Sequence, residues 1–399
     1  GTGILALPFG FVQGGVLSGP ALAAIGLWNW FNAQQLVAAR GLLLHRTGSP
    51  SASYSALVLA ALGPCGTALL ESSLVAVLGG VCASFQVQAA QLGAAVSGMA
   101  YLPCVACTIA LLVPLVLQTS ETAEHKQRTL QQVAIISALG LGALALSLLA
   151  VSAYGLLRFG LPTTLPAELR TIPTAQGFAD FFGISCFSFG LQTVVLPAQE
   201  RMSKPQSITV ALTYATTAVV AAYIFVGLSL SSIFASAASG QDQHGVEHGV
   251  QQVILMNLPP TSLLSAILQL SSALVAILSF PLPLVPLVEL SSARLASAFA
   301  RPPPPSTHLR LALLTLTSSL ASAVSHFGTL AAFIGCLSVL VSNVLPPLVH
   351  LLLCSHPHRK ASPAPVIFDA ALLALGIVSL VYFTSLTGIQ LLSGPSHDG

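Results

Sequence analysis

Hydrophobic residues along the chain gather in long runs, which short polar or Pro- and Gly-rich stretches separate. Most runs are about 18 to 25 residues long, the length that an α-helix needs to cross roughly 30 Å of hydrocarbon. They show no alternation of period two, so they predict helices and not barrel strands. The predicted membrane spans are 1–17, 20–39, 66–96, 102–117, 133–153, 177–199, 207–233, 261–293, 309–324, 327–353 and 366–391. Residues 54–62 are expected to form a short interfacial helix that ends at Gly63 and Pro64.

The composition supports a membrane protein. Charged residues make up 6% of the 399 residues and hydrophobic residues 54%, with a mean hydropathy of +0.87. An ordinary soluble domain carries about 25% charged residues, so this chain cannot cover itself with a polar surface. We therefore expect one transmembrane domain over 1–399, embedded in a lipid bilayer and without a nucleic-acid partner. The sequence identifies no protein partner.

The distribution of Lys and Arg predicts the orientation of the spans. If the chain starts on the cytoplasmic side and all eleven segments cross, 11 of the 13 basic residues fall inside. Only Arg158 and Arg170 fall outside. This bias supports both the number of spans and their direction.

Flexible residues interrupt two of the predicted spans deep inside the hydrophobic run. The interruptions are GTGILALP at 1–8 and FSFGL at 187–191. Glycine costs about 1 kcal/mol in a helix interior, and unwound backbone at membrane depth is tolerated only where it faces a cavity or a ligand. Matched breaks in two halves of a chain indicate a central transport site, where freed amides attract a carboxylate and freed carbonyls attract an ammonium group. Alternatively, the role of each of these glycines is to allow close packing between helices.

Segments spread along the chain resemble the amino acid/auxin permease family. GTGILALPFGFVQGG is similar to the first helix of that family, and FFGISCFSFGLQTVVLPAQERMSKP is similar to the sixth. VILMNLPP and SFPLPLVPLVEL resemble its Asn-Leu-Pro loop and eighth helix, and FGTLAAFIGCLSVLVSNVLPPLVHLLL resembles its tenth. The order and spacing of these segments extend the resemblance over nearly the whole chain.

The resemblance implies an all-α membrane protein with about eleven transmembrane helices and a five-plus-five inverted repeat. The repeats correspond to about 1–153 and 177–353, an extra helix follows at 366–391, and helices 1 and 6 are broken. Helix 1 is expected to be truncated, because the family has a half-helix before the first break and the chain opens inside a hydrophobic run without a methionine. The implied function is secondary active transport of amino acids by alternating access, driven by a cation.

The resemblance also assigns residues to a substrate site. Those that match the unwound first helix, which holds the substrate carboxylate, are Gly1, Thr2, Gly3 and Ile4. Those that match the break of the sixth helix, near the substrate amino group and side chain, are Ser188, Phe189 and Gly190. In addition, Ser84 and Gln88 lie four residues apart on one face of the third span. They are expected either to line the cavity or to bond between helices.

The coupling ion is expected to be a proton or a sodium ion, with no other cofactor. Acids inside a membrane are costly and usually functional. Glu289 on the eighth span lies deepest and is the candidate for a proton-linked carboxyl. If the coupling ion is sodium instead, the oxygen ligands beside the first break are expected to come from Ser271, Ser272 and Ser279. An interfacial role is expected for the acids nearer to helix ends, which are Glu71, Asp180, Glu200 and Asp369.

The expected substrate is a small or medium neutral amino acid, because neither interrupted segment contains an acid that could pair with a cationic side chain. A membrane-bound amino acid sensor without significant flux is the alternative function. An enzyme is not expected, since no nucleophile–base pair or metal cluster falls in the spans, and His244, Glu247 and His248 lie in a predicted outside loop. The expected location is a vacuolar, lysosomal or plasma membrane.

Overall fold

The computed structural model of the chain describes residues 2–47, 53–118, 123–162, 164–238, 249–259, 262–299, 306–354 and 363–393, and all regular structure within them is helical. The α-helices are α1 (Leu7–Gly14), α2 (Ser18–Thr47), α3 (Tyr54–Ser97), α4 (Tyr101–Gln118), α5 (Ala123–Phe159), α6 (Ala167–Arg170), α7 (Ala175–Ser188), α8 (Gln192–Arg201), α9 (Ile208–Ala238), α10 (Leu263–Ser279), α11 (Pro281–Phe299), α12 (Ser306–Ala323), α13 (Phe327–Val339), α14 (Leu345–Cys354) and α15 (Pro363–Ser393). The 3-10 helices are η1 (Thr2–Leu5), η2 (Gly15–Leu17), η3 (Pro205–Ser207) and η4 (Ile254–Asn257), and η5 (Leu340–Val344) is a π-helix.

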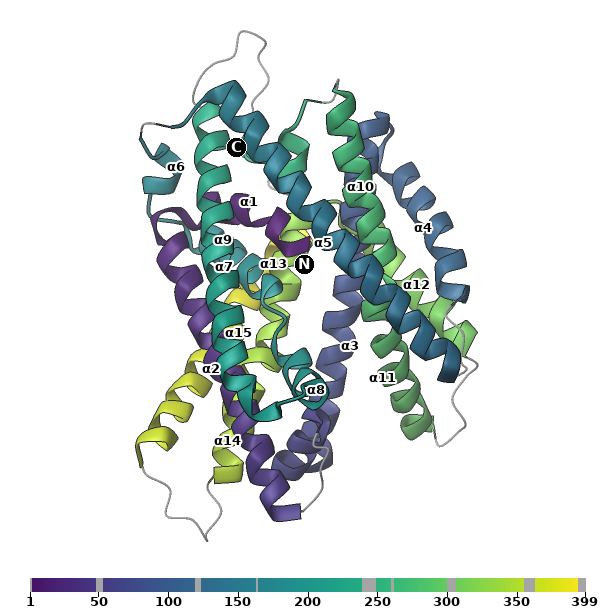
Figure 1. The fold of residues 1–399 in the computed structure, drawn as a ribbon, viewed down its shortest axis with the longest axis vertical. Coiled ribbons are helices and arrows are strands. Elements are labelled where there is room, and N and C mark those ends of the chain that lie inside the picture. Colours follow the sequence, from purple (N-terminus) through teal and green to yellow (C-terminus); the bar gives the residue numbers. More distant parts are fainter. Residues whose placement is uncertain are drawn as a thin grey trace.

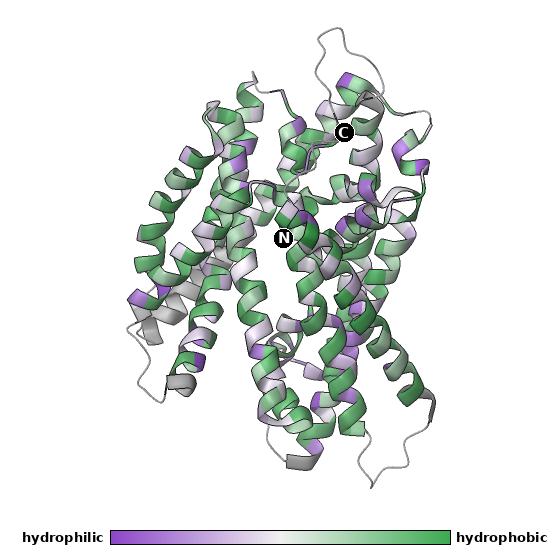
Figure 2. Ribbon diagram, turned by 180° about the vertical axis from the view of Figure 1, so that it is seen from behind, coloured by the Kyte–Doolittle hydropathy of each residue, from purple (hydrophilic) through white to green (hydrophobic). Residues whose placement is uncertain are grey.

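Most of the long helices run along the long axis of the molecule and form one bundle (Figure 1). Hydrophobic residues cover these helices along most of their length (Figure 2). Eight segments of the described residues are long and apolar enough to cross a membrane: Leu7–His45, Tyr54–Ser97, Leu139–Phe159, Ala175–Arg201, Pro205–Ala235, Leu263–Ala296, Phe327–Cys354 and Val366–Ser393. A shorter apolar helix covers Tyr101–Leu117. The prediction of an all-α, multi-pass membrane fold is confirmed.

All eleven predicted spans fall on helical segments, but several boundaries differ. The first two predicted spans join, because η2 leads directly from α1 into α2. The chain turns there at Gly15, whose φ of 51° lies in the left-handed region that favours glycine. The predicted interfacial helix is the first part of α3, which bends at Gly63 with a φ of 70°, directly before Pro64.

Among the described helices, the most extensive contact joins α7 to α13. At this crossing, a β-carbon on Gly335 would collide with the backbone carbonyl oxygen of Gly183. A β-carbon on Gly183 would collide in turn with the carbonyl of Ala332. Lipid gives no hydrophobic driving force between helices, so association depends on close van der Waals contact, which small residues permit. These two glycines therefore set how closely α7 lies against α13.

Replacing Gly335 by Ala is expected to separate the two helices, because the obstructing atom belongs to the backbone and cannot rotate away. Overpacking of this kind costs about 1–3 kcal/mol, and we expect the upper end of that range. The measurement is the thermal unfolding temperature of the purified protein in detergent. The control is Gly142→Ala on α5, where no heavy atom lies within 4 Å of an added β-carbon. Equal stability of the two variants would contradict the proposed role of this crossing.

Candidate functional site

The two helix interruptions predicted from the sequence lie against each other. The first is η1, which leads into α1, and the first residue of α1 follows Ala6 without a side-chain cap. The second lies between the end of α7 at Ser188 and the start of α8 at Gln192. A β-carbon on Gly3 would lie 2.5 Å from the Oγ atom of Ser188 and 3.2 Å from its Cα atom. A glycine at position 3 therefore allows η1 to touch the last residue of α7.

Side chains and nearby backbone bind the peptide groups that the second interruption releases. The hydroxyl of Tyr223 on α9 donates a hydrogen bond of 3.1 Å to the carbonyl of Ser188. The ring of Tyr223 packs against Phe189, with 5.4 Å between the ring centroids. The amide of Phe189 donates to the carbonyl of Cys186 at 3.1 Å, and the Ser188 hydroxyl donates to Ile184 at 2.9 Å. The interruption is thus a defined structure with its own partners.

Tyr223 was not identified from the sequence as a site residue. The available signal is a hydroxyl-bearing aromatic residue in the middle of the predicted span 207–233. A buried Tyr usually finds a partner for its hydroxyl, so such a residue indicates an acceptor on a neighbouring helix. The signal does not say which helix supplies that acceptor.

Opposite helix ends meet at this contact. The amino end of α1 carries partial positive charge, and the carboxyl end of α7 carries partial negative charge. At the junction of Gly3 and Ser188, η1, which leads into the amino end of α1, meets the last residue of α7. An amino acid zwitterion carries a carboxylate and an ammonium group, so it is complementary to both ends at once.

The other predicted residues of the two interruptions differ in exposure. Phe189 is buried and Ile4 is half-buried, whereas Gly190 is exposed. No heavy atom lies within 4 Å of a β-carbon added at Gly190. Close helix packing therefore does not explain the glycine at position 190. Thr2 contributes backbone to η1, and Gly1 lies outside the described residues.

Ser84 and Gln88 are fully buried on α3. The Gln88 side-chain amide donates a long hydrogen bond of 3.5 Å to the hydroxyl of Ser272 on α10. The Ser84 hydroxyl and the Gln88 carbonyl oxygen have no hydrogen-bond partner among the residues that the structure describes. These side chains form a polar cluster between α3 and α10 that still has hydrogen-bonding capacity.

The three serines considered for a sodium ion point in different directions. Ser272 faces Gln88, while the hydroxyl of Ser271 donates to the carbonyl of Leu268 in its own helix at 2.9 Å. Ser279 is half-buried at the last residue of α10. The main packing partners of α10 are α3 and α5.

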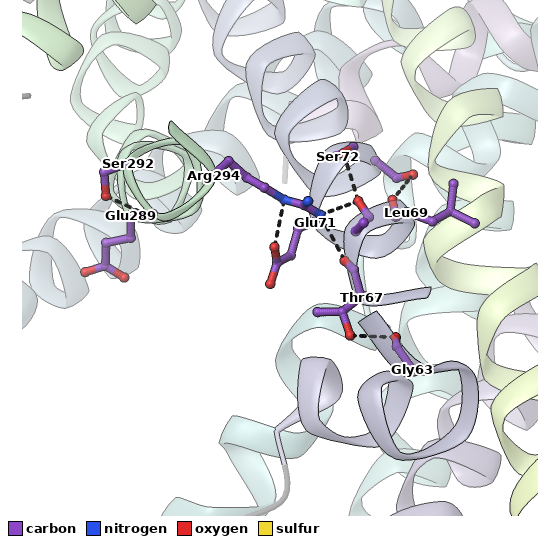
Figure 3. A network of polar contacts seen from close by, with 10 residues as sticks. Gly63, Thr67, Leu69, Glu71, Ser72, Glu289, Ser292 and Arg294 are labelled. Carbon is purple, nitrogen blue, oxygen red and sulfur yellow. Dashed lines mark hydrogen bonds and ion pairs between the residues drawn. The ribbon is translucent and has the colours of Figure 1, made fainter. Parts of the chain in front are cut away.

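Glu289 is exposed on α11. On the same helix, Arg294 forms an ion pair of 2.8 Å with Glu71 of α3 and donates to the carbonyls of Thr67 and Ala68. Figure 3 shows the carboxyl of Glu289 pointing away from Arg294 and Glu71. Arg294 therefore connects α11 to α3, whereas Glu289 lies on another side of α11.

Two of the cavities that described residues border lie away from the interruptions. The larger, of about 730 Å³, lies between α2, α7 and α15 and is lined mainly by apolar side chains such as Trp28, Phe31 and Phe383. The smaller, of about 540 Å³, lies between α3, α13 and α15. A zwitterion needs charged or hydrogen-bonding partners, and no charged side chain is among the lining residues of the larger cavity. The loop motif of His244, Glu247 and His248 lies outside the described residues.

Comparisons with known proteins identify the family and the fold of the chain. The family described as transmembrane amino acid transporter protein matches residues 1–389. Vacuolar amino acid transporter 3 of Schizosaccharomyces pombe (strain 972) is 28% identical over 113 residues, which are 28% of this chain and 15% of that protein. The chain thus aligns with a small part of this relative. The crystal structure of MhsT in complex with L-phenylalanine matches over 98% of this chain and 92% of the MhsT chain, with a TM-score of 0.52 and 12% identity. The chain has the fold of MhsT.

Tyr223→Phe is expected to loosen the second interruption, because it removes the hydrogen bond to Ser188 and keeps the ring contact with Phe189. A typical hydrogen bond contributes about 0.5–1.5 kcal/mol, so we expect a modest fall in the thermal unfolding temperature. Amide hydrogen exchange at 186–191 should become faster. The control is Tyr214→Phe on the same helix, whose side chain is 75% exposed. Unchanged exchange in Tyr223→Phe would refute the role of the hydroxyl.

Proposed function

The chain belongs to the transmembrane amino acid transporter protein family, and on this premise we propose that it carries small or medium neutral amino acids by proton-coupled alternating access. It is an integral multi-pass membrane protein of a transporter family and not an enzyme. The proposed substrate site is the junction of η1 with the interruption between α7 and α8. The proposed location is a vacuolar, lysosomal or plasma membrane, and the vacuolar location in the name of the S. pombe relative favours the vacuole.

The observation that carries this proposal is the contact between Gly3 and Ser188. It brings the amino end of α1 to the carboxyl end of α7, so that one small region attracts both charges of a zwitterion. A hydrogen bond to a charged group contributes about 1.5–3 kcal/mol. Three or so of these bonds would give micromolar to millimolar affinity, which corresponds to about 4–8 kcal/mol. Backbone groups are sufficient for this purpose.

The preference for neutral side chains follows from the chemistry of the two segments. Neither 1–6 nor 187–191 contains a charged residue. A cationic or anionic substrate side chain would therefore lose water in this region without gaining an opposite charge, which is costly. The half-buried Ile4 and the aromatic pair of Phe189 and Tyr223 offer apolar surface instead.

Alternating access is proposed to use the two repeats at about 1–153 and 177–353. Each repeat contains one of the touching interruptions. A non-helical segment can absorb large changes of φ and ψ, which makes it suitable as a hinge. Ser84 and Gln88 on α3 are proposed to line the route or bind ions, because their buried oxygens have remaining hydrogen-bonding capacity.

The substrate is tested by uptake of radiolabelled amino acids into proteoliposomes that contain the full-length protein. We expect small and medium neutral amino acids to accumulate when a pH gradient is imposed, without a requirement for sodium. Preferential uptake of arginine or glutamate would refute the neutral preference. Loss of uptake on replacing sodium would assign sodium as the coupling ion, and binding without flux would indicate a sensor.

Gly190→Val tests whether this position serves the transport cycle. An added β-carbon has no neighbour within 4 Å in the structure, so we expect membrane insertion and thermal stability to be retained. Uptake should fall to background, because a β-branched residue restricts the freed backbone and occupies the open space. The matched control is Gly41→Val on α2, where an added β-carbon also has no neighbour within 4 Å. Wild-type uptake by Gly190→Val would remove position 190 from the proposed site.

A further inference from the structure

Asp180 is a buried acid on α7 that is not part of the proposed substrate site. It lies in the second turn of α7 and is 5% exposed. The helix α7 belongs to the apolar segment Ala175–Arg201, which is long enough to cross a membrane. Asp180 therefore sits in the half-helix that ends at the proposed substrate site. Along the helix, about 12 Å separate it from Ser188 at 1.5 Å per residue.

The hydrogen-bond partners of Asp180 are neutral amides. The side-chain amide of Gln176 lies 3.4 Å from one carboxyl oxygen of Asp180. The side chain of Gln390 on α15 hydrogen-bonds to the same carboxyl group. Gln176 also donates to the Gln390 side-chain oxygen at 2.6 Å. The three side chains form one network between α7 and α15.

None of the described basic residues forms an ion pair with Asp180. The titratable group that faces it from α13 is the thiol of Cys336. The segments η1 and α1 contain no titratable side chain. From α2, Arg40 is paired with Glu200 of α8 at 2.9 Å. Among the described side chains of the helices that pack against α7, none forms an ion pair with Asp180.

The other deeply buried acid, Asp369 on α15, has different surroundings. One of its carboxyl oxygens lies 2.7 Å from Nδ1 of His350, and the other accepts a hydrogen bond of 2.5 Å from Gln35. A protonated imidazole can balance the charge of Asp369. An acid without such a partner avoids the large cost of a buried charge by binding a proton. Both acids are almost fully buried, so the two sites differ in their hydrogen-bond partners and not in their burial.

We propose that Asp180 is a proton-binding site whose occupancy is coupled to movement of α7, an inference that rests on the proposed proton-driven transport. Protonation converts the carboxylate to a neutral carboxylic acid, which α7 can bury against α13 and α15 without an opposite charge. Release of the proton leaves a carboxylate that favours contact with water. The two forms therefore favour different packing of α7.

The position of Asp180 explains how this change reaches the substrate. On another face of α7, Phe181 packs edge-on against Phe11 of α1, with ring centroids 6.0 Å apart. The end of the same helix touches η1 at Gly3. A displacement of α7 therefore moves both helix ends that form the proposed site. Gln176 and Gln390 are half-buried, so the amide network leads from the carboxyl toward the surface.

The test compares Asp180→Asn with wild type in proteoliposomes of the full-length protein. A pH gradient of one unit drives about tenfold accumulation when one proton moves with each substrate molecule, because 1.4 kcal/mol equals a factor of ten. We expect Asp180→Asn to lose this accumulation and to keep exchange of labelled for unlabelled amino acid across the membrane. That exchange should not depend on pH. Accumulation at the wild-type level would overturn the proposal.

Asp369→Asn is the matched control, since it makes the same change at a buried acid with an imidazole partner. It is expected to retain accumulation driven by the pH gradient. If Asp369→Asn loses accumulation while Asp180→Asn retains it, the proton site lies at Asp369 and the proposal fails. If Asp180→Asn does not fold, Asp180→Glu serves instead, and an unchanged pH midpoint of uptake in that variant would overturn the proposal.

Infrared spectroscopy of the purified protein tests the proton site without any transport. A protonated carboxyl has a C=O stretching band that a carboxylate lacks. Other protonated carboxyls contribute to the same band, so we expect its intensity at the pH of the uptake assay to fall by one carboxyl in Asp180→Asn and to be unchanged in Asp369→Asn. Failure of wild type to take up any amino acid would refute the proposed function alone. Absence of the band from wild type would refute the proton site alone.

Discussion

Hydrocarbon offers no hydrogen bonds, so every peptide group that a helix releases within the membrane needs a partner inside the protein. The structure meets this constraint with polar side chains from neighbouring helices. Tyr223 of α9 binds the carbonyl of Ser188 where α7 ends. Asn32 of α2 binds the carbonyl of Ser342 within the π-helix η5, at 3.2 Å. These two departures from α-helical geometry are thus each paired with a specific donor from a neighbouring helix.

The same constraint governs α7, which carries the proposed substrate site at its end. This helix lies between α1 and α13, which are its main packing partners. The glycine contact of Gly183 with Gly335 holds α7 against α13, and its last residue meets η1 at Gly3. The released backbone and the opposed helix ends are therefore placed by packing rather than by charged side chains. A site of this kind recognises the groups common to all amino acids and leaves selectivity to the apolar surface around them.

The sequence was sufficient to predict the spans and both interruptions, because hydrophobic runs and mid-span glycines are local signals. The partners of the interruptions were not predictable, since Tyr223 and Gly335 act through helices far away in the chain. The direction of Glu289 was also not predictable. Which face of α11 is buried depends on its packing against α3, a helix far away in the chain, and Glu289 lies on an exposed face. The contact of Gly3 with Ser188 depends on the fold as a whole.

The attachments of α7 and α8 show where movement can occur. Gln192 at the start of α8 donates to the side-chain oxygen of Asn29 on α2 at 3.0 Å, and Arg40 of α2 pairs with Glu200 near the end of α8. Both ends of α8 are therefore fixed to α2, whereas α7 is fixed to α13 through backbone contacts at glycines. The residues 189–191 join two half-helices with different attachments. Any displacement of one group of helices against the other must be absorbed there, directly beside the proposed substrate site.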